Sequence, residues 1–236
     1  MLDLQKIKAI SLDLDDTLWP IWPTIARAEA ALLAWLQANA PATAAQFASP
    51  AALRALRVHM EQARPDLQSD LSALRRESIR LALTRSGEPA ALAEPAFEVF
   101  FAARQAVQFY PDALPALQWL ASRYPLVAVS NGNADVQRVG LGAYFQAALS
   151  AHGFGVAKPD VRIFHAAAAA VQVQPHEVLH VGDDAVLDVQ GALDAGMQAV
   201  WVQRPEHHTS TQWPHAQPPH LTVADLGALC VALQAH

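Results

Sequence analysis

The stretch IKAISLDLDDTL, residues 7–18, decides the fold. Residues 7–13 are rich in β-forming side chains and end in acids, which predicts a short first strand with carboxylates at its C-terminal end. Residues two apart on a strand point to the same face, so Asp13 and Asp15 are expected to meet near one spot. Close carboxylates raise one pKa and attract a cation, although a strand-end turn with an acidic helix cap has the same pattern.

Beyond residue 106, predicted strands and helices alternate along the chain. The predicted strands are Leu126–Ser130, Ala147–Ala151, Val178–Val181 and Ala199–Val202, and the predicted helices are Pro111–Tyr124, Ala134–Leu141, Asp160–Val171 and Leu187–Ala195. This alternation predicts the α/β class, with a Rossmann-like, doubly wound parallel sheet covered by helices on both faces. Ligands of such sheets bind at the carboxyl ends of the strands.

Between Thr24 and about Ala103 the sequence shows no convincing strand. The helices predicted there are Ala26–Ala38, Pro50–Ala63, Leu67–Ser86 and Ala90–Ala103, with prolines between them. We therefore expect two domains: a catalytic core made of residues 1–19 and 106–236, and an all-helical cap made of residues 20–105. The insertion follows the first acidic turn, so we expect the cap to cover the site.

Composition limits the classes of function. The formal net charge of −6 argues against a surface that binds nucleic acid. The single cysteine, Cys230, excludes an internal disulfide framework and fits a reducing cytosol. Neither a signal-peptide core nor an apolar run long enough to span a bilayer is present in the sequence. We expect a cytoplasmic protein with no membrane partner, and the sequence leaves the oligomeric state open.

A second acidic cluster follows the predicted strand at Val178–Val181. It consists of Gly182-Asp183-Asp184 and, further on, Asp188. Alone, it is equally an ordinary glycine turn before a capped helix. Together with the first acids it suits Mg²⁺, which prefers oxygen ligands and keeps several waters. Asp13 and Asp183 are the expected side-chain ligands and Asp15 a backbone-carbonyl ligand, while Asp184 and Asp188 are expected to orient the ligands.

Two further polar segments complete the predicted site. Ser130-Asn131-Gly132 ends another strand, where its hydroxyl and N–H groups can hold phosphoryl oxygens, although Asn-Gly is also a common turn. Lys158 stands before Pro159 and a predicted helix, where its charge can offset that of a phosphoryl group and a nucleophile. A lone lysine is otherwise usually solvated.

In combination and in order, these segments resemble the four motifs of the haloacid dehalogenase superfamily. Residues 13–18 resemble motif I, Ser130 and Asn131 motif II, Lys158 motif III, and Gly182-Asp183 with Asp188 motif IV. The helical block resembles the type 1 cap of that superfamily. The resemblance covers nearly the whole chain.

The resemblance implies a role for each matching residue. Asp13 would attack phosphorus and become an aspartyl-phosphate, and Asp15 would protonate the leaving oxygen and then activate water. Thr17 would fix the turn, while Ser130, Lys158 and Mg²⁺ would offset charge. Dehalogenases of the family lack an aspartate at the position of Asp15, so this residue favours a phosphatase.

Some stretches resemble a narrower group, the bacterial flavin mononucleotide phosphatases, which includes enzymes acting on 5-amino-6-(5-phospho-D-ribitylamino)uracil in riboflavin synthesis. The matching stretches are residues 126–134, 140–145, 179–184 and 196–201. The substrate implied is a small phosphorylated metabolite. Phosphatases of nucleotides or sugar phosphates are the alternative, because the cap matches less well.

Four residues are candidates for substrate selectivity. Trp19 and Trp22 can stack on a flat heterocycle, although buried structural tryptophans are commoner. Arg75 and Arg76 can donate to a phosphate or carbonyl, although helix-surface arginines are usually solvated. A loop at residues 204–219 is rich in histidine, but its irregular spacing does not favour a transition-metal site.

Three other functions fit parts of the pattern. A phospho-receiver module shares the early acids and the Lys-Pro pair, but Ser130 stands where its phosphoacceptor should be. A catalytically dead binding protein of this fold would retain clustered acids without use. A phosphomutase shares motif I and would form an isomer instead of free phosphate.

Overall fold

The computed structural model describes residues 2–204, 213 and 217–234. Internal contacts divide the chain into two units. The first consists of residues 1–20 and 108–236, and the second of residues 21–107. The expected domain boundaries, after residues 19 and 105, fall beside these divisions.

The first unit is built on a six-stranded sheet in which every described pair of neighbours is parallel. The strands are β1 (Ala9–Leu12), β2 (Leu126–Ser130), β3 (Ala147–Ser150), β4 (Val178–Gly182), β5 (Gln198–Val202) and β6 (Leu221–Val223). Their order is β3-β2-β1-β4-β5-β6. The predicted doubly wound α/β fold is therefore confirmed, and the order changes direction at β1, where such sheets bind ligands.

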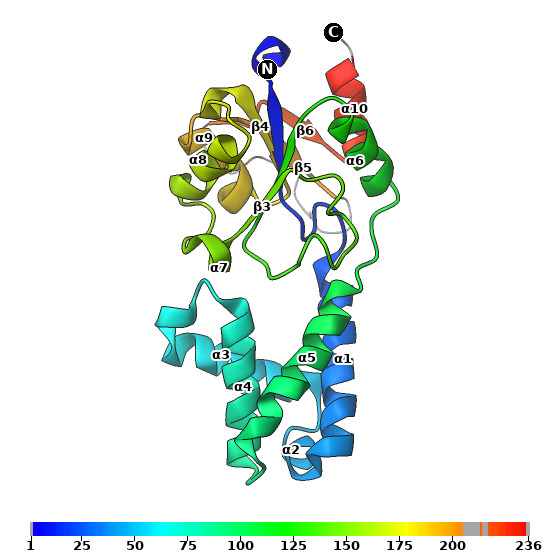
Figure 1. The fold of residues 1–236 in the computed structure, drawn as a ribbon, viewed down its shortest axis with the longest axis vertical. Helices are drawn as coiled ribbons and strands as arrows, with labels where there is room; N and C mark the ends of the chain where they lie inside the picture. Colours follow the sequence, from blue (N-terminus) through cyan, green and yellow to red (C-terminus); the bar gives the residue numbers. More distant parts are fainter. Residues whose placement is uncertain (1, 205–212, 214–216, 235–236) are drawn as a thin grey trace. The chain divides into compact units, whose positions relative to one another are not determined.

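Helices cover both faces of this sheet. Figure 1 shows α8 (Val161–Ala170) and α9 (Gly191–Asp194) on one side, and α6 (Ala113–Ala121) and α10 (Leu226–Gln234) on the other. β1, β2, β4 and β5 are buried along their whole length, as expected for strands covered on both faces. The register pairs Leu12, the last residue of β1, with Val181 of β4 and with Ala128 of β2, so β4 ends about level with β1 and β2 runs on to Ser130.

The second unit contains helices only in its described structure. They are α1 (Ile21–Asn39), α2 (Pro41–Gln46), α3 (Pro50–Ala63), α4 (Leu71–Arg85) and α5 (Ala93–Gln105), with 3₁₀ turns at Pro65–Leu67 and Ala90–Leu92. Ser49 and Asp70 cap α3 and α4 by accepting hydrogen bonds from backbone N–H groups. Leucines and phenylalanines of α1, α4 and α5 form a core of their own.

The predicted helix at Ala134–Leu141 is wrong, because this segment consists of turns. Oδ1 of Asp135 accepts hydrogen bonds from the N–H groups of Gln137 and Arg138, and Gly140 adopts φ 84°. An aspartate that bonds nearby backbone groups competes with helix formation, and a glycine in the left-handed region ends the segment. α2, β6 and α10 were not predicted.

Across the described ranges, no helix has both the length and the apolar character needed to cross a membrane.

Candidate active site

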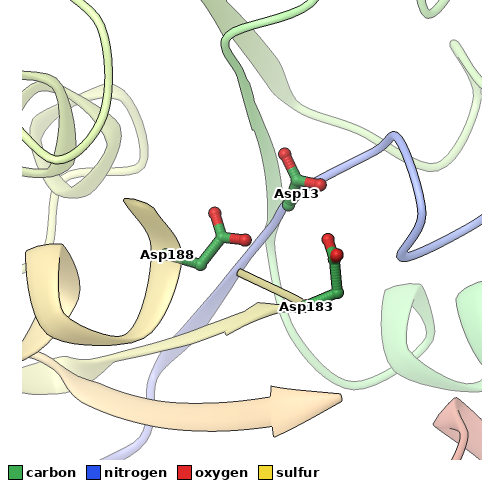
Figure 2. Close-up of side chains that lie close together, drawn as sticks. All are labelled: Asp13, Asp183 and Asp188. Carbon is green, nitrogen blue, oxygen red and sulfur yellow. The ribbon is translucent and has the colours of Figure 1, made fainter. Parts of the chain in front are cut away.

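Three carboxylates converge at the carboxyl edge of the sheet. Asp13 follows β1, Asp183 follows β4, and Asp188 lies in the π-helix at Ala185–Gln190. One oxygen of each lies within 4.8 Å of one oxygen of each other residue (Figure 2). The level ends of β1 and β4 explain this meeting, because the N–H of Asp13 donates to the carbonyl of Val181.

Lys158 joins two of these acids. Its Nζ lies 2.5 Å from Oδ1 of Asp13 and 2.5 Å from Oδ1 of Asp188, and only 4% of the residue is exposed. Although burial favours a neutral amine, the two carboxylates raise the pKa of Lys158 above its ordinary value. The lysine is therefore a buried cation shared between two anions.

The three carboxylates at this edge carry more negative charge than Lys158 alone can balance. Burial raises the pKa of Asp13 to about 7, with Lys158 opposing the shift and Asp188 adding to it. Burial and the charge of Asp13 raise the pKa of Asp183 to about 9. Three carboxylates face one ammonium, so ionising all of them is unfavourable without another positive charge. This oxygen donor set fits a divalent metal ion of the kind that prefers hard ligands.

Asp188 accepts hydrogen bonds through both of its carboxylate oxygens. Besides Lys158, its Oδ1 contacts Nε2 of His180 at 3.4 Å, and its Oδ2 accepts from the N–H of Asp184 at 3.0 Å. Gly182 permits this position, since a Cβ there would lie 2.3 Å from Cγ of Asp188. Although burial opposes it, Lys158 lowers the pKa of Asp188 below its usual range. Asp188 is therefore suited to hold Lys158.

The loop after β1 folds back on itself in a tight turn. The N–H of Asp16 donates to the carbonyl of Trp19 at 2.8 Å, and Asp16 adopts φ 59°, which aspartate tolerates better than most residues. Thr17 Oγ1 lies 3.4 Å from Oδ2 of Asp13 and 3.3 Å from Oδ1 of Asp183. Its hydroxyl therefore bridges two acids from different strands.

Asn131 fixes the backbone of Lys158. Its Oδ1 accepts from the N–H of Lys158 at 2.7 Å, and its Nδ2 donates to the carbonyl of Lys158 at 2.9 Å. Asn131 therefore holds the backbone of Lys158 through both polar atoms of its amide. Ser130 Oγ accepts from the N–H of Gly132 at 2.9 Å, which closes the turn after β2.

Asp184 acts as an N-cap. Its Oδ1 accepts from the N–H groups of Val186 and Leu187, both at 2.8 Å. This contact starts the π-helix that carries Asp188. A π-helix is rare and is often found at functional sites.

Arg204 lies two residues past the end of β5 and was not among the site residues predicted from the sequence. It donates to both carboxylate oxygens of Asp112, at 2.7 and 2.9 Å, and to the carbonyl of Thr17 at 2.7 Å. The guanidinium also lies 4.0 Å from the ring centroid of Tyr110. In the sequence, only its place after a strand indicated that Arg204 could hold Asp112 and the turn at Thr17, because both partners lie far away along the chain.

Trp19 is not a stacking surface, so its selection for substrate recognition is corrected. None of its surface is exposed, and its ring packs edge-on against Phe109. Its Nε1–H donates to Oδ1 of Asp15 at 2.8 Å. Trp22 differs, because 62% of its surface is exposed and the guanidinium of Arg54 lies 5.7 Å from its ring centroid.

The two arginines selected for recognition both make contacts within the helical unit, and the burial of Arg75 corrects its selection. Arg75 is buried over the ring of Phe100 and lies 3.8 Å from the buried Glu29. Burial lowers the pKa of Arg75 to about 10.

Arg76 stacks over Phe97 and donates to Glu94 at 3.0 Å, with Glu98 at 3.9 Å. Its guanidinium therefore serves contacts between α4 and α5.

Of the histidine-rich loop at residues 204–219, the structure describes residues 204, 213 and 217–219. His207, His208 and His215 lie outside the described residues. His220, just past the loop, accepts a hydrogen bond from the N–H of Ala199 through Nδ1 at 3.2 Å, which supports the pairing of β5 and β6.

The sheet topology and these acids agree with the comparison to protein families. Residues 7–196 match the model described as haloacid dehalogenase-like hydrolase, so the chain belongs to this family. The predicted family, the enzyme class of hydrolase and the fold are thereby confirmed. The family typically uses a divalent metal.

Relatives of the chain include enzymes of two kinds. It is 36% identical over 231 residues to the 5-amino-6-(5-phospho-D-ribitylamino)uracil phosphatase YigB of Escherichia coli, covering 96% of both chains. It is 37% identical over 136 residues, 55% of both chains, to a phosphoserine phosphatase of Thermus thermophilus. A crystal structure of a 2-haloacid dehalogenase from Pseudomonas syringae pv. tomato has a TM-score of 0.85 and 36% identity, covering 97% of this chain and 100% of that one.

Proposed function

We propose that this protein is a Mg²⁺-dependent phosphatase that hydrolyses phosphomonoesters through an aspartyl-phosphate on Asp13. The observation that carries the proposal is Lys158 held between Asp13 and Asp188, 2.5 Å from each, beside the acid Asp183. Lys158 favours the ionised form of Asp13 against the effect of burial and places a cation beside it at the switch point of the sheet, which suits a nucleophile for an anionic substrate.

In the first step, an oxygen of Asp13 forms a bond to phosphorus while the bond from phosphorus to the ester oxygen breaks. Asp15 gives its proton to the leaving oxygen. In the second step, Asp15 takes a proton from water, and the oxygen of that water attacks phosphorus and releases Asp13. Lys158 and the hydroxyl of Ser130 offset the charge of the transferred group in both steps.

Asp13, Asp183 and the backbone carbonyl of Asp15 are the proposed residues for holding Mg²⁺, with Asp184 and Asp188 orienting them. The bound ion supplies charge that stabilises the phosphoryl oxygens. Thr17 supports this arrangement, because its hydroxyl lies within 3.4 Å of both Asp13 and Asp183.

Asp15 supports the choice between a phosphatase and a dehalogenase. A carbon–halogen bond releases halide, which needs no proton, whereas an ester oxygen leaves more easily when an acid protonates it. Trp19 donates to the carboxylate of Asp15 at 2.8 Å and fixes its orientation. A dehalogenase needs no such acid for its leaving group, so we favour the phosphatase.

For the substrate we propose a small metabolite with a planar ring, namely 5-amino-6-(5-phospho-D-ribitylamino)uracil or the related flavin mononucleotide. The first of these is the substrate named for YigB, which matches 96% of this chain. Phosphorylated nucleotides and sugars are the alternative. The site takes this small molecule as its partner, and we place the protein in the cytoplasm with no nucleic-acid or membrane partner.

Within the helical unit, Trp22 and Arg54 are the proposed recognition pair. Trp22 presents an exposed indole, and Arg54 lies beside it with its Nε donating to buried Glu29 at 3.2 Å. Nη2 of Arg54 also pairs with Glu29, so the guanidinium is fixed beside the indole. A flat ring with carbonyl groups uses both, by stacking and by hydrogen bonding.

The experiment is a substrate panel assayed with Mg²⁺ and with excess chelator. It contains the ribitylaminouracil phosphate, flavin mononucleotide, nucleoside monophosphates, sugar phosphates and 2-haloacids. We expect phosphate release only with Mg²⁺, no halide release, and the highest kcat/KM for the planar-ring substrates. Halide release with no phosphate release would overturn the proposed reaction.

Two variants test recognition against a matched control. Trp22→Ala and Arg54→Lys should lower kcat/KM for the planar-ring substrates by about fivefold, since an aromatic contact contributes about 1 kcal/mol. Both variants should leave kcat/KM for sugar phosphates unchanged. Arg76→Lys, at an arginine occupied by Glu94, is the control that should change neither.

A further inference from the structure

His180 is a buried polar residue that the proposed reaction does not use. It lies on β4, none of its surface is exposed, and its ring packs edge-on against Phe164 at a centroid distance of 5.0 Å. Nδ1 lies 2.8 Å from Oγ of Ser11 on β1, and Nε2 lies 3.4 Å from Oδ1 of Asp188. Both ring nitrogens therefore have partners that come from other elements.

These partners fix the tautomer of the ring. The carboxylate of Asp188 only accepts hydrogen bonds when ionised, so Nε2 must carry the proton. Burial lowers the pKa of His180, which favours the neutral ring. Nδ1 of that ring is then an acceptor, and the hydroxyl of Ser11 must be its donor. Hydrogen-bond donation runs from Ser11 to His180 and from His180 to Asp188.

We infer that His180 is a positioning residue that sets how Lys158 is shared between Asp188 and the nucleophile Asp13; this inference rests on the function proposed above. Oδ1 of Asp188 accepts from both Lys158 and His180. The N–H of His180 takes up part of the negative charge on that oxygen. Without this donor, Asp188 attracts the ammonium more strongly and draws it away from Asp13.

The position of Lys158 matters because the charge on Asp13 changes during the reaction. Asp13 is an anion before attack and loses that charge when it becomes an acyl phosphate. Asp188 keeps its charge throughout and holds the ammonium beside the transferred group. The balance set by His180 therefore acts on the transition state, where an ammonium displaced toward Asp188 stabilises less charge.

The test compares variants that separate hydrogen bonding from packing. His180→Phe fills the ring volume and removes both nitrogens, His180→Gln retains an N–H donor, and Ser11→Ala removes the donor to Nδ1. Phe164→Leu is the control, because it alters the wall of the same ring and leaves both hydrogen bonds in place. Each variant is measured for kcat and KM with p-nitrophenyl phosphate and for thermal unfolding.

A positioning role predicts a drop in kcat of about 10- to 100-fold in His180→Phe, which is the usual size for residues behind a site, with KM within about twofold. His180→Gln should recover much of that loss, and Ser11→Ala should lie between them. Phe164→Leu should lower the melting temperature with little loss of kcat. Wild-type kcat in His180→Phe would overturn the role, and if that variant does not fold, His180→Leu, which also lacks a donor to Asp188, takes its place.

A second readout does not depend on turnover. Nitrogen NMR of the wild type should show a neutral His180 with the proton on Nε2, and Ser11→Ala should shift the Nδ1 resonance. A proton on Nδ1 would overturn the inference even in an active phosphatase. The predicted tautomer in a protein that hydrolyses no phosphomonoester would instead refute the proposed function and leave the hydrogen-bond chain standing.

Discussion

The indole N–H of Trp19 donates a hydrogen bond of 2.8 Å to Oδ1 of Asp15, within a turn closed by the N–H of Asp16 and the carbonyl of Trp19. The indole is fully buried and packs against Phe109, so its donor has a fixed direction. The residue proposed as acid and base is therefore oriented by its own loop.

Changing Asp15 to asparagine should separate the two steps of the reaction. The amide cannot activate water, so the phosphoryl group transferred to Asp13 should remain there. With p-nitrophenyl phosphate, whose leaving group needs little protonation, we expect a burst of phenol followed by arrest. Rapid-mixing absorbance measures the burst, and undiminished steady-state turnover would remove Asp15 from its role.

Changing Trp19 to phenylalanine should slow turnover while the loop keeps its fold. The ring still fills the space beside Phe109, but the donor to Asp15 is lost. Hydrogen bonds to charged groups contribute about 1.5–3 kcal/mol, so kcat should fall by about tenfold or more. The control is Trp22→Phe, at an exposed indole, which should leave kcat for p-nitrophenyl phosphate unchanged. An equal loss in both variants would argue against the orienting contact.

The stability of the metal-free protein should fall as pH rises from about 5 to about 9. The pKa of Asp13 is raised to about 7 and that of Asp183 to about 9, mainly by burial, whereas unfolded aspartate titrates near 4. Over this window the folded state therefore binds more protons than the unfolded state, and the free energy of unfolding decreases with pH.

Asp188 and Lys158 do not reverse this trend between pH 5 and 9, and His180, whose pKa is lowered by burial, only weakens it below about pH 7, where unfolded histidine binds a proton. The pKa of Asp188 is lowered despite its burial, so its stabilising effect is already present above pH 4 and is lost only in acid. The pKa of Lys158 is raised despite its burial, so its effect persists until strongly alkaline pH.

Mg²⁺ should consequently raise the melting temperature more at pH 8.5 than at pH 5.5, because its ligands must lose their protons. Scanning calorimetry with and without the ion measures both trends. A metal effect that is equal at both pH values, or greater in acid, would contradict this account of the acids.

Arg204 should matter for both stability and turnover. It holds Asp112 through two hydrogen bonds and the catalytic turn through the carbonyl of Thr17. Removing one partner of such a mostly buried pair leaves an unpaired charge, so Arg204→Leu should cost about 2–4 kcal/mol of unfolding free energy. Denaturant titration measures it. Arg204→Lys keeps the charge and should restore part of the stability but less of kcat, since it lacks the forked geometry.

Much of the sheet could be predicted because its strands are short apolar runs that end in polar turns. Leu126–Ser130, which was predicted with these bounds, is β2 of the structure. The acids were predicted to converge because β1 and β4 are parallel, and Asp13 and Asp183 do meet. Parallel strands place their carboxyl ends together whatever the helices between them do.

Contacts between distant side chains could not be predicted from local pattern. A tryptophan after an acidic loop can equally stack on a ligand or bond inside the loop, and only the fold shows Trp19 turned toward Asp15. Arg75 stands on a helix whose periodicity does not reveal that Glu29 faces it from α1. The helix predicted at Ala134–Leu141 failed because the side chain of Asp135 competes for backbone N–H groups.

The most direct test of the account is to trap the phosphorylated enzyme. Asp15→Asn incubated with p-nitrophenyl phosphate and Mg²⁺ should gain the mass of one phosphoryl group, and peptide mapping should place it on Asp13. The double variant Asp13→Asn, Asp15→Asn should gain none, and circular dichroism should show that it is folded. A phosphoryl group on another residue, or phosphate release by Asp13→Asn at the wild-type rate, would contradict the central claim.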